Sequence, residues 1–136
     1  MPTDDLQDAA VLVMNRDDKN VRLTSSLLEK LGLQVLHVSS DSEALDVLNG
    51  AGKSAKLLIM DEAATSATVS GFLERARSEN HEIPVLIISE RDELASAGGW
   101  MSQAHVRGFL RKPFRRAKFV GSVLELIGGG ALVRTA

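Results

Sequence analysis

The chain has 136 residues, of which 44% are hydrophobic and 25% are charged, and its formal net charge is −2. This length suits one domain whose hydrophobic core is large enough to fold without disulfides or structural metals. The absence of cysteine excludes disulfides and thiolate metal sites. The slightly negative net charge argues against nucleic acid as a partner. No apolar stretch reaches the roughly 20 residues of a membrane span, and MPTDDLQD does not have the pattern of a signal peptide. We therefore expect a cytoplasmic protein.

Five short apolar runs, rich in valine, isoleucine and leucine, predict five β-strands. They cover residues 9–14, 34–38, 56–60, 84–88 and 106–110. Four of these runs are near-continuous rather than alternating, which is typical of strands buried on both faces of a parallel sheet.

Helical patterns follow each run. In chain order, an apolar stripe starts at Val21 and ends at Gly32, a capping-box pair opens a helix at Ser40, and shorter patterns lie at 72–76 and 92–103. A last amphipathic pattern covers 119–127 and stops at a glycine. This alternation predicts a doubly wound α/β fold, (βα)5, over residues 9–127, with an N-terminal extension at 1–8 and a flexible tail at 128–136.

The carboxyl ends of the strands are where such sheets bind ligands. The first strand ends in Asn15, Arg16, Asp17 and Asp18, the third in Asp61 and Glu62, the fourth in Ser89 and Glu90, and the fifth in Lys112. A carboxylate, a hydroxyl and an ammonium group therefore converge at one edge. A carboxylate attacks phosphorus in aspartyl-phosphate chemistry, while a hydroxyl and a lysine bind phosphoryl oxygens.

Three of these stretches, KLLIMD, PVLIIS and GFLRKPF, resemble the response-regulator receiver family of two-component signalling. The resemblance covers residues 9–127 and implies a flavodoxin-like fold with strand order 2-1-3-4-5. It assigns the phospho-acceptor role to Asp61, phosphoryl binding to Ser89 and Lys112, and an aromatic switch to Phe109. It also implies that the Lys112–Pro113 peptide is cis, as X-Pro bonds permit.

The chain departs from the family at the site itself. The two acidic positions after the first strand, the second of which is a Mg²⁺ ligand in the family, fall on Asn15 and Arg16. A guanidinium about 4 Å from a divalent ion opposes it by roughly 4 kcal/mol per unit pair at an effective dielectric of about 20. Two alternatives would compensate for the lost metal ligand. Asp17 binds the metal together with Asp61, or the Arg16 guanidinium pairs with Asp61 in place of the metal.

Two further departures lie nearby. Glu90 stands where the family keeps a small residue, and it would crowd the phosphate path and repel a dianion. The loop after Asp61, EAATSATVSG, lacks the turn motif of the family and reaches its glycine, Gly71, two residues late.

Two functional hypotheses follow. The first is a phosphorelay receiver, not an enzyme, that accepts a phosphoryl group on Asp61 from a histidine kinase or phosphotransfer protein, with Mg²⁺ as cofactor, and signals to a downstream partner through the 107–127 face. The second is a pseudo-receiver, a protein-interaction module independent of phosphorylation, because Asn15 and Arg16 replace the metal-binding pair. A nucleotide- or flavin-binding domain ranks third, since no glycine-rich loop follows the first strand.

Structural alternatives exist for each site residue. Asp61 alone would start a turn, Ser89 would cap a helix with Asp92 three residues on, and Lys112 would be solvated. NGAGKSA, residues 49–55, is similar to the end of a P-loop, but Val47 replaces its first glycine, so a plain turn is expected.

Overall fold

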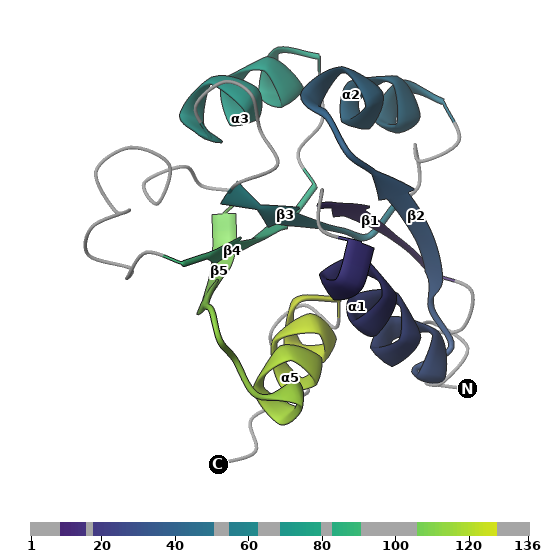
Figure 1. Cartoon of the computed structure of the whole chain (residues 1–136). Helices are drawn as coiled ribbons and strands as arrows, with labels where there is room; N and C mark the ends of the chain where they lie inside the picture. Colours follow the sequence, from purple (N-terminus) through teal and green to yellow (C-terminus); the bar gives the residue numbers. More distant parts are fainter. Residues whose placement is uncertain are drawn as a thin grey trace.

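The computed structural model describes residues 9–15, 18–50, 55–62, 69–79, 83–90 and 106–127, shown in colour in Figure 1. The predicted helix at 92–103 and the segments 1–8 and 128–136 lie outside these residues. Within the described part of the chain, no helix is long and apolar enough to cross a membrane.

A five-stranded parallel sheet forms the centre of the fold. Its strands are β1 (Ala10–Met14), β2 (Gln34–Val38), β3 (Leu57–Asp61), β4 (Val85–Ser89) and β5 (Val106–Arg111), in the order β2-β1-β3-β4-β5. All four neighbouring pairs are parallel. After β1, the chain adds β2 on one side and then β3, β4 and β5 on the other, so the topological switch point lies between β1 and β3. The predicted doubly wound architecture and strand order are therefore confirmed.

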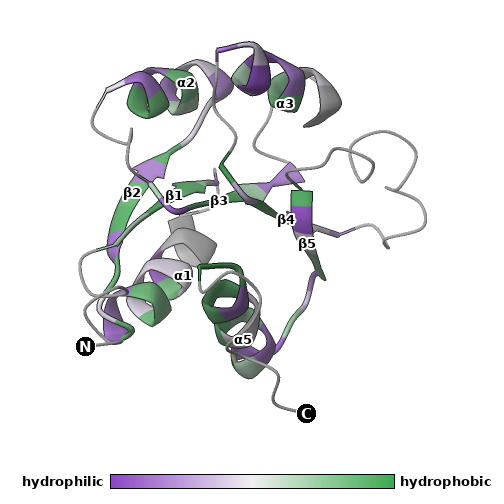
Figure 2. Cartoon of the chain, turned by 180° about the vertical axis from the view of Figure 1, so that it is seen from behind, coloured by the Kyte–Doolittle hydropathy of each residue, from purple (hydrophilic) through white to green (hydrophobic). Residues whose placement is uncertain are grey.

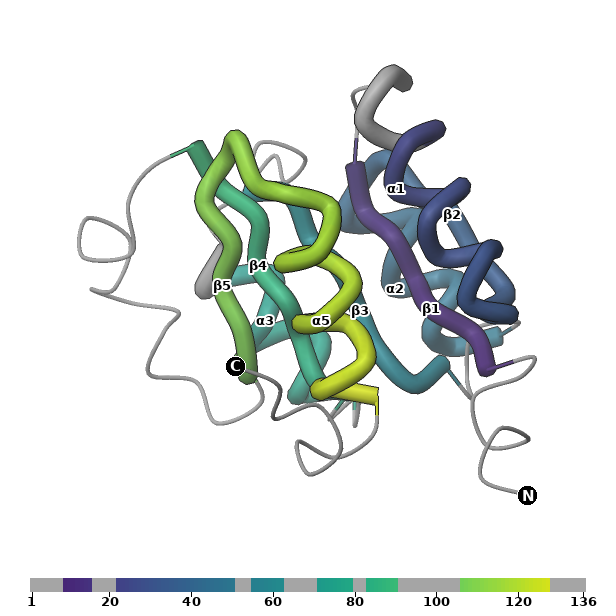
Figure 3. Tube along the Cα trace, turned by 90° about the horizontal axis from the view of Figure 1, so that it is seen from below, coloured from purple at the N-terminus to yellow at the C-terminus, as the bar shows by residue number. Residues whose placement is uncertain are grey.

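Helices cover both faces of this sheet. The helices α2 (Asp41–Asn49) and α3 (Val69–Ser78) lie on one face, and α1 (Asp18–Lys30) and α5 (Arg116–Ile127) lie on the other (Figure 1). Seen from below, α1 lies beside β1 and β2, and α5 lies in front of β3 and β4 (Figure 3).

The core consists of two clusters separated by the sheet. One face of the strands packs with α2 and α3 around Leu45 and Phe72, and the other packs with α1 and α5 around Leu28 and Phe119. Central strands are apolar along their length (Figure 2), because successive side chains point to opposite faces and both faces are covered. The near-continuous runs in the sequence have this cause.

Helix α1 ends at a glycine-dependent cap. Gly32 has φ 86°, a left-handed conformation that glycine adopts without steric cost. Its N–H donates to the carbonyl of Glu29, and the N–H of Leu33 donates to that of Leu28, at 2.9 and 3.2 Å. These two bonds form a Schellman motif, which turns the chain into β2.

Helix α2 begins at the predicted cap. The Ser40 hydroxyl accepts from the N–H of Glu43 at 3.2 Å. The Glu43 carboxylate accepts from the N–H of Ser39 at 2.7 Å, one residue before the position that a standard capping box uses. At the other end of α2, Gly50 is the C-cap, and most of the turn expected at 49–55 lies outside the described residues.

Candidate functional site

Asp61 and Lys112, 51 residues apart in sequence, meet at the carboxyl edge of the sheet. Asp61 is the last residue of β3 and is only 4% exposed. Lys112 directly follows β5, its peptide bond to Pro113 is cis as the family resemblance implies, and its Nζ donates to Asp61 Oδ2 in a direct ion pair. The side chain of Lys112 is 19% exposed. The strongest element of the predicted site, a carboxylate beside an ammonium group, therefore exists in this fold.

Ser89 lies at the same edge but contacts a different carboxylate. It ends β4 and is 1% exposed, and its Oγ donates to Oε1 of Glu62 at 2.5 Å. Sequence reasoning placed Glu62 at the end of the third strand without giving it a role. The structure adds it to the site as the acceptor of the Ser89 hydroxyl.

The alternation of side chains explains these two pairs. Leu57 and Ile59 of β3 pack on the α1/α5 side, so Asp61, two residues further on, belongs to that side, and Glu62 belongs to the opposite one. In β5, Phe109 packs on the α2/α3 side and Leu110 packs on the α1/α5 side. Lys112 is two residues beyond Leu110, so alternation puts it on the same side as Asp61. By the same count, Ser89 shares the side of Glu62, because Val85 and Ile87 pack with α2 and α3.

A backbone hydrogen bond fixes the two pairs relative to each other. The N–H of Lys112 donates to the carbonyl of Ser89 at 2.8 Å and continues the β4–β5 ladder by one step. The backbones of Ser89 and Lys112 are therefore direct neighbours, although their side chains belong to opposite faces of the sheet.

Asn15 occupies the first of the two positions that are acidic in the family. It is 5% exposed, its N–H donates to the carbonyl of Val38 at 3.1 Å, and its own carbonyl lies 2.8 Å from Nε2 of His37. Arg16 and Asp17 lie outside the described residues. Asn15 belongs to the same side of the sheet as Asp61, since Val11 and Val13 pack there.

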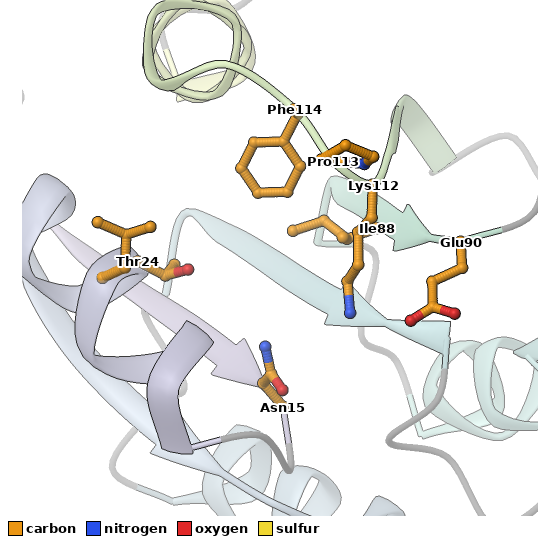
Figure 4. Close-up of a pocket in the computed structure, with 8 residues that line it drawn as sticks. Asn15, Thr24, Ile88, Glu90, Lys112, Pro113 and Phe114 are labelled. Carbon is orange, nitrogen blue, oxygen red and sulfur yellow. The ribbon is translucent and has the colours of Figure 1, made fainter.

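A pocket of about 600 Å³ opens beside these residues, between α1 and the turn that follows β5. Figure 4 shows the Lys112 side chain reaching into it from that turn, with Asn15 below and Glu90 at one side. Thr24, Ile88 and Phe114 supply further parts of the wall. Glu90 is exposed and lines the pocket, which puts its carboxylate beside the entrance.

Phe109, the predicted switch residue, is half-buried in β5. It packs against the core cluster on the α2/α3 side, and it also lines a second pocket of about 520 Å³. The other lining residues are Leu110, Arg111, Pro113, Phe114, Arg115 and Lys118. Phe109 thus contacts both the interior and a surface formed by β5 and the start of α5.

The described residues do not fit a resident Mg²⁺ ion. They include no group of three acidic or histidine side chains placed to hold a metal. Of the two carboxylates at the end of β3, Asp61 is paired with Lys112 and Glu62 accepts from Ser89, while Asn15 offers only an amide. Mg²⁺ is usually bound through carboxylates that are open to it, together with waters and phosphate oxygens.

Comparisons with known proteins agree with this geometry. A sequence model of the response regulator receiver domain matches residues 11–124. The chain therefore belongs to the receiver domain family of two-component signalling proteins. A search of curated proteins found no match.

Crystal structures with the same fold include three receiver domains. One from Clostridium thermocellum has a TM-score of 0.77 and 22% identity over 91% of this chain and 98% of that one. A CheY-like protein from Methanospirillum hungatei has a TM-score of 0.78 and 15% identity, covering 91% and 97%. The receiver domain of the sensor histidine kinase PA1611 from Pseudomonas aeruginosa has a TM-score of 0.76 and 20% identity, covering 89% and 98%, and holds a magnesium ion in its active-site cleft.

Proposed function

We propose that this receiver domain accepts a phosphoryl group on Asp61 from a histidine kinase or phosphotransfer protein in the cytoplasm and signals by binding a partner. The observation that carries the proposal is the direct contact between the Lys112 ammonium and the Asp61 carboxylate. An ammonium group at this place orients the carboxylate and offers charge to the oxygens of an arriving phosphoryl group. It has three hydrogens, so it can hold Asp61 and a phosphoryl oxygen together.

The proposed chemistry is a single displacement at phosphorus. An Asp61 carboxylate oxygen forms the new P–O bond, and the P–N bond of a phosphohistidine breaks, after which the imidazole takes up a proton. The domain receives the group and turns over no substrate of its own, so we do not class it as an enzyme. Lys112 neutralises charge on the transferred oxygens, and Ser89 supplies a hydroxyl hydrogen bond to them.

We further propose that the downstream partner binds the 107–127 face. Six basic residues lie within twelve positions of this face and no acidic residue interrupts them: Arg107, Arg111, Lys112, Arg115, Arg116 and Lys118. Except for Lys112, these side chains are exposed. Phe119 is fully buried and Phe114 stacks on it at 5.6 Å between ring centroids, so the phenylalanines support the core rather than present faces to nucleic-acid bases. The positive charge of the 107–127 face favours a protein partner with an acidic surface.

A second candidate function is a pseudo-receiver that binds its partner without phosphorylation. The specific observation in its favour concerns the groups beside Asp61. Asn15 is an amide where the family has an acidic residue, and among the described residues no group of carboxylates is placed with it to hold a metal. Glu90, at the pocket entrance, adds a negative charge on the path of an anionic group.

Intact-mass measurement after incubation with acetyl phosphate separates these two functions. The phospho-receiver gains one phosphoryl group of mass, and Asp61→Asn gains none. Incubation with and without Mg²⁺ tests whether the metal is needed despite the poor fit. Lys112→Gln is the matched second variant, and it should slow labelling while Asp61 remains. An unlabelled wild-type protein that still binds its partner would establish the pseudo-receiver instead.

A further inference from the structure

The Ser89 hydroxyl is already committed to a carboxylate in the unphosphorylated protein. Its Oγ donates to Glu62 Oε1 at 2.5 Å, and Ser89 is 1% exposed, so water has little access to compete for this hydrogen. A hydroxyl carries one hydrogen and donates to one acceptor at a time. A phosphoryl oxygen on Asp61 and the carboxylate of Glu62 therefore exclude each other as acceptors of Ser89.

Lys112 does not face the same conflict. Its ammonium group pairs with Asp61 and keeps two further hydrogens for other oxygens. Of the two groups expected to hold the phosphoryl oxygens, only Ser89 must give up a protein partner first.

We propose that Glu62 is a positioning residue that holds Ser89 as an internal substitute for the phosphoryl group and sets how readily Asp61 is phosphorylated. This inference rests on the proposed phosphoryl transfer to Asp61. Glu62 acts in two ways: its carboxylate keeps the Ser89 hydroxyl, and its negative charge, next in sequence to Asp61, repels an incoming dianion. When the phosphoryl group arrives, its oxygen replaces Glu62 Oε1 as acceptor, and no covalent bond to Glu62 forms or breaks.

The fold explains why this residue reaches Ser89 and Asp61 does not. Counted in alternation from the core residues of their strands, Glu62 and Ser89 fall on the α2/α3 side of the sheet, and Asp61 and Lys112 fall on the α1/α5 side. A carboxylate one residue beyond the acceptor is therefore on the correct face for the serine at the end of the neighbouring strand.

The test compares acetyl phosphate labelling rates in a cycle of Glu62→Gln, Ser89→Ala and the double variant. Glutamine keeps the shape of the side chain, but a neutral acceptor binds a hydroxyl about half as strongly as a carboxylate. We expect Glu62→Gln to label about tenfold faster than wild type. In the Ser89→Ala background it should lose most of this advantage, because only the removal of the negative charge then remains. Glu29→Gln, on the exposed part of α1 near its C-terminal end, removes the same charge away from the site and should leave the rate unchanged.

A role in folding alone would not make the effect of Glu62 depend on Ser89. Equal acceleration by Glu62→Gln with and without the serine hydroxyl, or no acceleration at all, would overturn the proposal. The same four proteins are also unfolded in urea without a phosphodonor. There the two substitutions should be coupled by about tenfold in the unfolding equilibrium constant, which is about 1.4 kcal/mol.

The two readouts distinguish the failure of this inference from that of the proposed function. If no variant is labelled, phosphoryl acceptance on Asp61 is refuted, and the urea cycle alone decides whether Glu62 holds Ser89. Labelling of Glu62→Gln in the absence of wild-type labelling would support the inference most strongly. Additive effects in urea would overturn it whatever the labelling shows.

Discussion

Replacing Lys112 by methionine should destabilise the domain by about 3 kcal/mol. Breaking a buried ion pair by removal of one partner costs about 3–5 kcal/mol, because the remaining charge is left in a poorly solvated place. The side chain of Asp61 is 5% exposed and that of Lys112 is 19% exposed. Water that enters the space left by Lys112 can partly solvate the remaining charge, so we expect a cost at the lower end of about 3–5 kcal/mol. Methionine retains most of the length and apolar contact of the lysine stem.

Urea denaturation at neutral pH measures this change. With a slope of about 2 kcal/mol per molar, the unfolding midpoint should fall by about 1.5 M. Lys56→Met is the matched control, since Lys56 is exposed before β3 and its loss should change stability by less than about 0.5 kcal/mol.

The decisive comparison adds Asp61→Asn to Lys112→Met. A neutral amide costs less to bury than an unpaired carboxylate, so the double variant should be more stable than Lys112→Met alone, by at least about 1 kcal/mol. If the two single losses simply add in the double variant, the two charges do not interact, and the assignment of this pair as the centre of the site is wrong.

Four further substitutions test turns, caps and close contacts of the fold, each by the same denaturation assay. Gly32→Ala should cost about 1–2 kcal/mol, because φ 86° is unfavourable for any residue with a Cβ; no loss would contradict the Schellman cap. Gly121→Ala should stabilise α5 by about 0.5–1 kcal/mol, since a Cβ there meets nothing within 4 Å, whereas Gly108→Ala should destabilise because its Cβ would lie 2.9 Å from Cδ1 of Leu86; equal effects would refute this contrast. Ser40→Ala should cost about 1 kcal/mol through loss of the α2 cap, and an unchanged midpoint would count against that hydrogen bond.

Much of this fold follows from local patterns in the sequence. The apolar runs predict strands because each is buried on both faces, and the predicted ends of β3 and β4 differ from the observed ones by a single residue. Asp61 and Lys112 were predictable as neighbours, since strand ends meet at one edge of a parallel sheet. The cap of α2 at Ser40 was also predictable, because it depends on residues within one turn.

The partner of Ser89 was not predictable in the same way. It depends on which face each strand presents at its last residue, and therefore on the register between β3 and β4, which pairs Asp61 with Ile88. The available signal was the alternation of side chains along each strand, counted back from Ser89 and Glu62. This count places the two residues on one face only when it is already known which strand residues pack on which face of the sheet.

The strict assignment of alternate residues to opposite faces limits how β3 can change in evolution or in engineered chimeras. Deletion of one residue between Leu57 and Asp61 would turn the acceptor aspartate towards the serine and the glutamate towards the lysine. Insertions and deletions in descendants of this chain should therefore accumulate in the connecting loops. A graft of the site onto another scaffold should keep the length of the strand as well as its final residues.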